Sequence, residues 1–253
     1  QILRTYEDDS RIKVVREENK GISGARNYGL KMARGKYVMF IDNDDMFLPN
    51  TFQYLMKYAE KYNADIVKCA HKIVGKRQYD VFDSNGYVWG MLIKREIFKK
   101  INFPEGFWYE DMITRLLIYR MCKSFVYIDS PLYFHRMHKN NASAKVWSPR
   151  SIKALDQFRL AKKITEYAFL LKLPLDEWVY RVYLSEFGKL LYERTINLDL
   201  RIRQAIFVQC CNMLRLLISK IKITHLGKYE NILNNALINS DFDLWELVCK
   251  YYL

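Results

Sequence analysis

The chain has 253 residues, and 50% of them are hydrophobic, so it can bury the core of one large or two small domains. Charged residues make up 27% and aromatic residues 15%, which excludes a disordered chain. No apolar run approaches the roughly 20 residues that span a bilayer, and residues 1–10 do not resemble a secretory signal. The net charge of +13 allows a nucleic acid, an anionic membrane or a phosphorylated substrate as partner, or a basic surface that is simply solvated.

The cysteines favour a reducing compartment. There are five of them, an odd number, and none has the CxxC spacing of a metal or redox motif. The four histidines do not lie at ligand spacing from them, so we expect no zinc site. The five predicted free thiols are Cys69, Cys122, Cys210, Cys211 and Cys249.

The first part of the chain alternates strand and helix patterns, which predicts an α/β layer. In chain order we expect a strand at 11–15, a helix at 25–34, a strand at 36–42, a helix at 49–62 and a strand at 64–69. Because the run at 36–42 is continuously apolar, we expect it to be buried, with helices on both faces. Further on we expect an apolar segment at 86–93, a short helix at 96–100, a helix at 111–121, a strand at 125–128 and a loop at 131–144.

From about residue 148 the helical period takes over and glycine becomes rare. We therefore predict an α/β domain at 1–147 and a helical region of four to six helices at 148–253, with breaks at Pro174 and Gly227. Six cations and no acid lie between residues 201 and 229. This segment can be a basic amphipathic helix on an anionic leaflet, or a helix packed on the first domain.

Clustered carboxylates follow the predicted strand at 36–42, in the run Phe40-Ile41-Asp42-Asn43-Asp44-Asp45. A strand that ends in carboxylates carries them to the ligand-binding edge of an α/β sheet. Asp42 and Asp44 can face one cavity there, and such oxygen ligands suit Mg²⁺ or Mn²⁺ together with a diphosphate. The alternative is a turn in which Asp42 or Asn43 caps the next helix. Repulsion among three acids makes the cation site the preferred interpretation.

A second motif is the glycine-containing stretch Asn19 to Gly29, at the start of the predicted helix. Small residues let a ligand approach the backbone, and a helix N-terminus favours anions. Arg26 can contact phosphate or hold the aspartates in place. No Gly-Lys-Ser/Thr follows, so the stretch is not a Walker loop.

At this spacing the two motifs resemble the family 2 glycosyltransferases with the GT-A fold. The family's run stands here as Asn19 to Gly29, then Gly35 to Asp45. Trp89 to Arg95 is similar to the acceptor-side segment, Glu110-Asp111 to the Glu-Asp motif, and Tyr133 to Arg136 with Ser143 to the closing segment. The resemblance implies a GT-A domain over about 1–145 that lacks the usual opening strands for uracil and ribose, so we expect a truncated chain whose own turnover is in doubt.

The resemblance also implies a role for each matched residue. Asp42 and Asp44 would contact ribose and the cation-bound diphosphate, with Asp44 as the preferred direct ligand of Mn²⁺ or Mg²⁺. Arg26 would lie beside the diphosphate, and Asp111 would be the general base. Asp45, Trp89 and Glu110 would shape the donor-sugar and acceptor pocket, which would also contain His135 and Arg136. Without the resemblance, Glu110-Asp111 would be interpreted as a helix cap.

Two further points concern the closing and acceptor-side segments. His135 could complete the cation site or contact the diphosphate, and Arg136 could contact the diphosphate, whereas for His138 we favour an exposed, hydrogen-bonded loop position. Met91 stands where many relatives carry Lys, so contacts to the acceptor there are not predicted.

The implied reaction is transfer of a sugar, with inversion, from a UDP-sugar to a hydroxyl of a glycan or lipid-linked glycan at the bacterial surface. A cation would stabilise the leaving diphosphate and one carboxylate would take the acceptor proton; a retaining glycosidase would need two close carboxyls. This predicts a cytoplasmic enzyme, peripheral on the inner face of the plasma membrane. The alternatives are a non-catalytic scaffold with this fold and a nucleic-acid-binding protein, which the absence of a reader motif disfavours.

Overall fold

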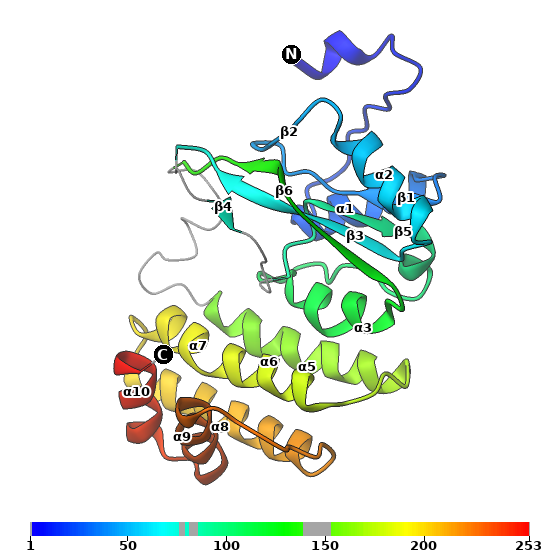
Figure 1. Cartoon of the computed structure of the whole chain (residues 1–253). Coiled ribbons are helices and arrows are strands. Elements are labelled where there is room, and N and C mark those ends of the chain that lie inside the picture. Colours follow the sequence, from blue (N-terminus) through cyan, green and yellow to red (C-terminus); the bar gives the residue numbers. More distant parts are fainter. Residues whose placement is uncertain (1, 76–78, 81–85, 139–152, 253) are drawn as a thin grey trace.

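A computed structural model describes residues 2–75, 79–80, 86–138 and 153–252. A mixed sheet forms one part of the molecule and a helical bundle forms the other, with α3 (Tyr119–Met121) between them (Figure 1). The strand order is β1-β5-β3-β6-β2, and β4 pairs with β3. Only β3 and β6 run parallel; the other named pairs are antiparallel.

The sheet part of the chain contains short strands separated by helices. Its elements are η1 (Ile2–Tyr6), α1 (Gly21–Met32), β1 (Tyr37–Met39), β2 (Met46–Phe47), α2 (Thr51–Lys61), β3 (Ile66–Ile73), β4 (Tyr79–Asp80), β5 (Met91–Lys94), η2 (Arg95–Lys99), η3 (Thr114–Ile118), α3 and β6 (Phe125–His135). The order follows the predicted alternation and confirms the α/β class. The predicted helix at 111–121 is π-helical over η3 and continues as α3.

Side chains of β3 alternate between two cores, as the period of a strand requires. Val67 packs with Leu55 of α2 on one face, and Ile66 packs with Met91 on the other. The second face is covered by η2, η3 and the bundle (Figure 1). This larger core runs without a break from the sheet into the bundle, so it crosses the boundary predicted at residue 147. The division into two domains stays a prediction.

The bundle contains six helices in the described part of the chain, within the predicted four to six. They are α5 (Ala154–Leu170), α6 (Glu177–Phe187), α7 (Lys189–Thr195), α8 (Leu200–Ile218), α9 (Lys228–Asn239) and α10 (Phe242–Tyr251). Asp176, Asp199 and Asp241 cap α6, α8 and α10 through their side chains. Trp245 is 1% exposed, and its indole N–H donates to the carbonyl of Phe187 at 2.8 Å, which joins α10 to the end of α6.

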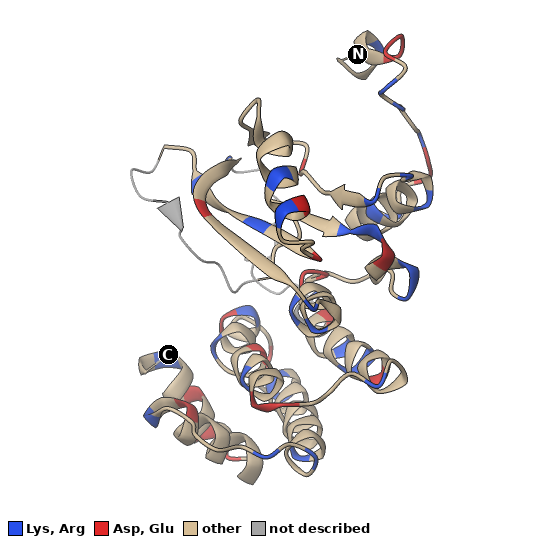
Figure 2. Ribbon diagram, turned by 45° about the vertical axis from the view of Figure 1, so that its right-hand side comes forward, with Lys and Arg blue, Asp and Glu red and all other residues tan. Residues whose placement is uncertain are grey.

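The basic segment at 201–229 forms most of α8, the connection after it and the first residues of α9. The apolar face of α8 is buried in the bundle and includes Phe207 and Leu214. Arg203 pairs with Glu246, and Arg215 donates to the carbonyl of Ile238 at 2.8 Å. Acidic and basic residues are interspersed over the bundle (Figure 2). The apolar face expected to meet a leaflet is thus packed inside the protein, and membrane association stays a prediction.

The described helices are all too short or too polar to cross a membrane.

Three local expectations were wrong. Residues 11–15 form no strand; Ile12 and Val15 are exposed and no neighbouring strand pairs with them. Residues 131–135 are not loop but the end of β6, because parallel pairing with β3 extends the strand. The buried strand expected at 36–42 is the shorter, half-buried β1 at the sheet edge, which among the described strands pairs only with β5.

Candidate active site

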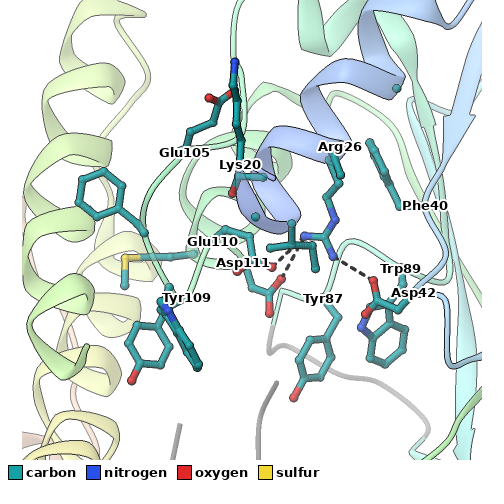
Figure 3. Close-up of a pocket in the computed structure, with 18 of the residues that line it drawn as sticks. Lys20, Arg26, Phe40, Asp42, Tyr87, Trp89, Glu105, Tyr109, Glu110 and Asp111 are labelled. Carbon is teal, nitrogen blue, oxygen red and sulfur yellow. Dashed lines mark hydrogen bonds and ion pairs between the residues drawn. The ribbon is translucent and has the colours of Figure 1, made fainter. Parts of the chain in front are cut away.

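A cleft of about 1810 Å³ opens between the sheet and the bundle (Figure 3). Its lining comes from the start of α1, the residues that follow β1, the loop 105–112, and α6 and α7 of the bundle. Asp42, Asp44, Trp89, Glu110, Asp111, Arg26 and His135 all line it. Seven of the nine predicted site residues therefore surround one cleft, whereas Asp45 and Arg136 are not among the residues that line it.

Arg26 is the centre of this site. It lies in the second turn of α1, and its side chain is only 6% exposed. The guanidinium donates to Glu110 Oε1 at 2.8 Å and to Asp42 Oδ1 at 3.2 Å, and its Nη1 lies 4.0 Å from Asp111 Oδ1 (Figure 3). It also lies against the ring of Phe103, 5.4 Å from the centroid. One cation thus holds together three carboxyl groups from two separate segments.

Two of these carboxyl groups have raised pKa values. Burial raises the pKa of Asp42, and the neighbouring Arg26 charge opposes that shift. Burial and then the adjacent Glu110 charge raise the pKa of Asp111 well above its usual range. The Asp111 side chain is still 30% exposed, toward the cleft. A carboxyl group with a raised pKa that faces a cleft suits proton transfer.

Asp45 and Asp44 differ in their surroundings. Asp45 is 8% exposed and accepts from the hydroxyl of Tyr133 and from the backbone N–H of Arg136 at 2.9 Å. The Arg136 side chain donates to the backbone carbonyl of Asp44. Asp45 is therefore a buried anchor for the strand that closes the site, whereas the Asp44 carboxylate is 29% exposed.

His138 lies beside Asp44. Its Nε2 is 3.0 Å from Asp44 Oδ2, and both residues line a second cavity of about 420 Å³. His138 occupies an exposed, hydrogen-bonded loop position, as expected, and it meets Asp44 because the segment after β6 returns to the residues that precede β2. An imidazole nitrogen and a carboxylate oxygen are donors that Mn²⁺ accepts, and Mg²⁺ accepts the latter. The residues that the structure describes contain no cluster of three or more such ligands, so a cation here needs oxygens from a ligand or water.

Trp89 lies in a stack of three rings. Its indole is parallel to Tyr87 and Tyr133, with centroids 4.6 and 4.4 Å apart and an interplanar angle of 12° in both cases. His135 lies 5.6 Å from the same indole. The stack connects the cleft to the hydroxyl group of Tyr133, which donates to Asp45. The predicted pocket residues Trp89 and His135 therefore lie on the side of the cleft that is near Asp45.

The glycine-containing stretch begins a helix earlier than predicted. α1 starts at Gly21 (φ +72°), a conformation that favours glycine, whose N–H donates to Asn19 Oδ1 at 3.0 Å. Lys20, the residue before the helix, makes no side-chain cap. Lys20, Gly21 and Ser23 line the cleft, so the first turn faces the same space as Asp42.

Sequence reasoning missed several lining residues, among them Tyr109, Arg115, Glu186 and Arg194. Arg115 Nη1 donates to Glu186 Oε1 at 2.8 Å, and the Arg194 guanidinium lies 3.8 Å from the centroid of the Tyr109 ring. Glu186 and Arg194 belong to α6 and α7, where no local motif marks them. The only signal in the sequence is that Glu186 is an acid at a position where the helical pattern predicts an apolar, buried residue.

Comparisons with known proteins find glycosyltransferases. The family model described as Glycosyl transferase family 2 matches residues 1–121. The chain is 30% identical over 169 residues to the glycosyltransferase EpsJ of Bacillus subtilis, across 56% of this chain and 49% of that protein. It is 30% identical over 211 residues to the glycosyltransferase GlyA of Streptococcus pneumoniae, across 71% of this chain and 30% of that protein. The chain therefore spans half or less of these relatives.

A solved structure shares the fold. Staphylococcus aureus TarS 1–349, crystallised with UDP-GlcNAc, superposes with a TM-score of 0.72 and 15% identity, over 99% of this chain and 78% of that one. The match extends over the bundle as well as the sheet, and the fold is GT-A-like. Residues 1–121, which carry most of the motif segments that line the cleft, match glycosyl transferase family 2.

Proposed function

We propose that this chain transfers a sugar from a nucleotide donor, preferably a UDP-sugar, to a hydroxyl group of a bacterial surface glycan. One observation carries the proposal: Arg26 joins Asp42, in the segment after β1, to Glu110 and Asp111 in one cleft. TarS, which shares the fold, was crystallised in complex with UDP-GlcNAc, and this supports a UDP-sugar as the donor class.

On the donor side, we propose that Asp42 contacts ribose and that Asp44 and His138 hold Mn²⁺ or Mg²⁺ against the diphosphate. Asp42 shares its Oδ1 with Arg26, whereas Asp44 meets His138 at 3.0 Å, so Asp44 is the better direct ligand. The cation, when bound, supplies charge stabilisation to the leaving diphosphate. Arg26, Lys20 and the first turn of α1 add positive potential on the same side.

On the acceptor side, we propose that Asp111 is the general base. The acceptor oxygen forms a bond to the anomeric carbon as the bond from that carbon to the diphosphate breaks, and the acceptor proton passes to the Asp111 carboxylate. One displacement inverts the anomeric centre. Glu110 keeps Asp111 beside Arg26. Trp89 and His135 bound the sugar pocket, and Asp45 with Arg136 holds its closing strand.

The setting follows from the resemblance to enzymes of bacterial surface polysaccharides. We propose a glycan or lipid-linked glycan as acceptor, presented at the cytoplasmic face of the membrane, and no role for nucleic acid. Division into a catalytic part at 1–147 and a helical part at 148–253 belongs to the same proposal.

The direct test is calorimetric titration of UDP into the protein with Mn²⁺, with Mg²⁺ and with EDTA, for the parent chain and Asp44→Ala. We expect cation-dependent binding that Asp44→Ala weakens at least about tenfold, the loss of one charged contact of about 1.4 kcal/mol. Release of UDP from UDP-GlcNAc and other UDP-sugars is then measured for the parent chain and Asp111→Asn. UDP binding without any cation dependence would contradict the cation site, and full turnover by Asp111→Asn would contradict the base.

A further inference from the structure

The loop that carries Glu110 and Asp111 rests on the bundle. The Arg194 guanidinium of α7 stacks on Tyr109, 3.8 Å from the ring centroid. The backbone N–H of Trp108 donates to Asp156 Oδ2 of α5 at 3.2 Å. Arg159 and Lys163 of α5 lie over the ring of Phe107. Three consecutive residues, 107 to 109, therefore contact the bundle.

Tyr109 has a backbone conformation that needs support. Its φ is +65°, in the left-handed region that an aromatic residue rarely adopts. Asp111 lies two residues further along, so the direction of its carboxyl group depends on this turn. The cation that lies over the Tyr109 ring is the Arg194 guanidinium. A contact from α7 therefore stabilises the strained residue beside the proposed base.

The other end of the loop is tied to α6 of the bundle. Arg115, in η3, donates through Nη1 to Glu186 Oε1 at 2.8 Å. Glu186 is 5% exposed, accepts from the side-chain amide of Gln157 at 2.7 Å, and lies 3.7 Å from Arg194 Nη1. A buried carboxylate is costly unless it is paired, so Glu186 keeps both arginines near it.

Backbone packing adds a third constraint on the loop. A Cβ on Gly86 would lie 2.5 Å from the side chain of Arg115 and 3.0 Å from the backbone oxygen of Asp111. The loop is thus packed tightly against Gly86 on one side and against Arg194 and Glu186 on the other.

From these contacts we propose that Arg194 and Glu186 of the bundle are positioning residues for Asp111. They hold the loop 107–112 so that the Asp111 carboxyl group faces the cleft. The inference rests on the proposed role of Asp111 for its functional consequence, but its structural content stands by itself. The helical region is then part of the active centre rather than an appendage to it.

The first test is hydrogen exchange measured by mass spectrometry on the whole chain, for the parent, Arg194→Ala and Arg201→Ala. Arg201 is an exposed arginine of α8 and serves as the matched control. We expect Arg194→Ala to raise exchange in 107–112 at least about tenfold, while α1 and the control variant stay unchanged, because local opening tracks local contacts. Unchanged exchange in 107–112 would overturn the inference, whether or not the chain binds UDP.

The second test separates positioning from donor binding. For Arg194→Ala, we expect the dissociation constant of UDP to stay within about twofold and the turnover of a UDP-sugar to fall by up to about 100-fold, the effect of a small misplacement of a catalytic group. Arg194→Lys keeps a charge near Glu186 without the planar stack, and covers the case in which Arg194→Ala unfolds; we expect intermediate exchange and turnover. Equal loss of UDP affinity and turnover would indicate a merely structural role. Normal turnover in Arg194→Ala, with loss in Asp111→Asn, would overturn the positioning role and leave the proposed function intact.

Discussion

Arg26 and Glu110 are 84 residues apart in the chain, and the Arg26 guanidinium donates to Glu110 Oε1 at 2.8 Å. The same guanidinium reaches Asp42 Oδ1 at 3.2 Å. With its side chain 6% exposed, Arg26 compensates a group of carboxylates that would otherwise repel one another.

Removal of Arg26 leaves Asp42, Glu110 and Asp111 without this cation. We expect Arg26→Ala to lower the free energy of unfolding by about 3 kcal/mol, the cost of breaking a largely buried pair. Urea denaturation measures this change. The matched control is Arg34→Ala, an exposed arginine just after α1, with an expected change within about 0.5 kcal/mol. Equal values for the two variants would show that the Arg26 pairs carry no net stability.

Asp111 should make stability depend on pH in an unusual direction. Its pKa is raised in the folded protein, so its favourable contribution is complete below the unfolded pKa of about 3.9 and is lost as pH rises through the folded pKa. Asp111→Asn removes this loss. We expect the free energy of unfolding of Asp111→Asn minus that of the parent to increase as pH rises from 4 to neutrality, measured by urea denaturation. A difference that does not change with pH would contradict the raised pKa.

Deprotonation of Asp111 lowers stability but should raise turnover. A base must be deprotonated, so UDP-sugar turnover is expected to rise with pH through the raised pKa of Asp111. The measurement is a pH profile of turnover at saturating donor. A profile that falls over the acidic range would rule out Asp111 as the group that must lose its proton.

His138 gives a test of the cation site that is independent of Asp44. Because its Nε2 lies 3.0 Å from Asp44 Oδ2, we expect His138→Ala to weaken Mn²⁺-dependent UDP binding about tenfold or more and to leave cation-free binding unchanged. His225→Ala, at an exposed position in the turn before α9, is the control. Calorimetry with Mn²⁺ and with EDTA measures both. Unaltered Mn²⁺ dependence in His138→Ala would remove His138 from the site.

Tyr133 tests the buried position of Asp45. Tyr133→Phe keeps the ring stack with Trp89 and removes the hydroxyl that donates to Asp45. We expect a loss of about 1–3 kcal/mol in the free energy of unfolding, because the buried carboxylate loses a donor. Tyr62→Phe, an exposed tyrosine after α2, should change it by less than about 0.5 kcal/mol. Thermal or urea unfolding of the two variants measures both changes, and equal changes would contradict a stabilising role for the Tyr133 hydroxyl.

Local patterns account for much of the site. The helix that carries Arg26 and the strand β1, which leads to Asp42, are adjacent in sequence, so their meeting follows from one short helix–strand arrangement. The end of β6 could not be predicted in the same way. Pro131 argues against a strand interior because it lacks a backbone N–H, and only the parallel pairing with β3 shows that the strand continues through it.

The sequence alone determined the chemistry of the motif segments, the α/β order of elements and the helical second half, because these depend on the burial and turn preferences of neighbouring residues. Tertiary structure alone decided that Arg26 is shared between Asp42 and Glu110, that His138 meets Asp44, and that Arg194 supports Tyr109. Each of these contacts joins residues that are far apart in the chain, so the period of a helix or strand does not predict it. Their proximity results from how the sheet, the loop and the bundle pack around one core, and local sequence patterns do not specify that packing.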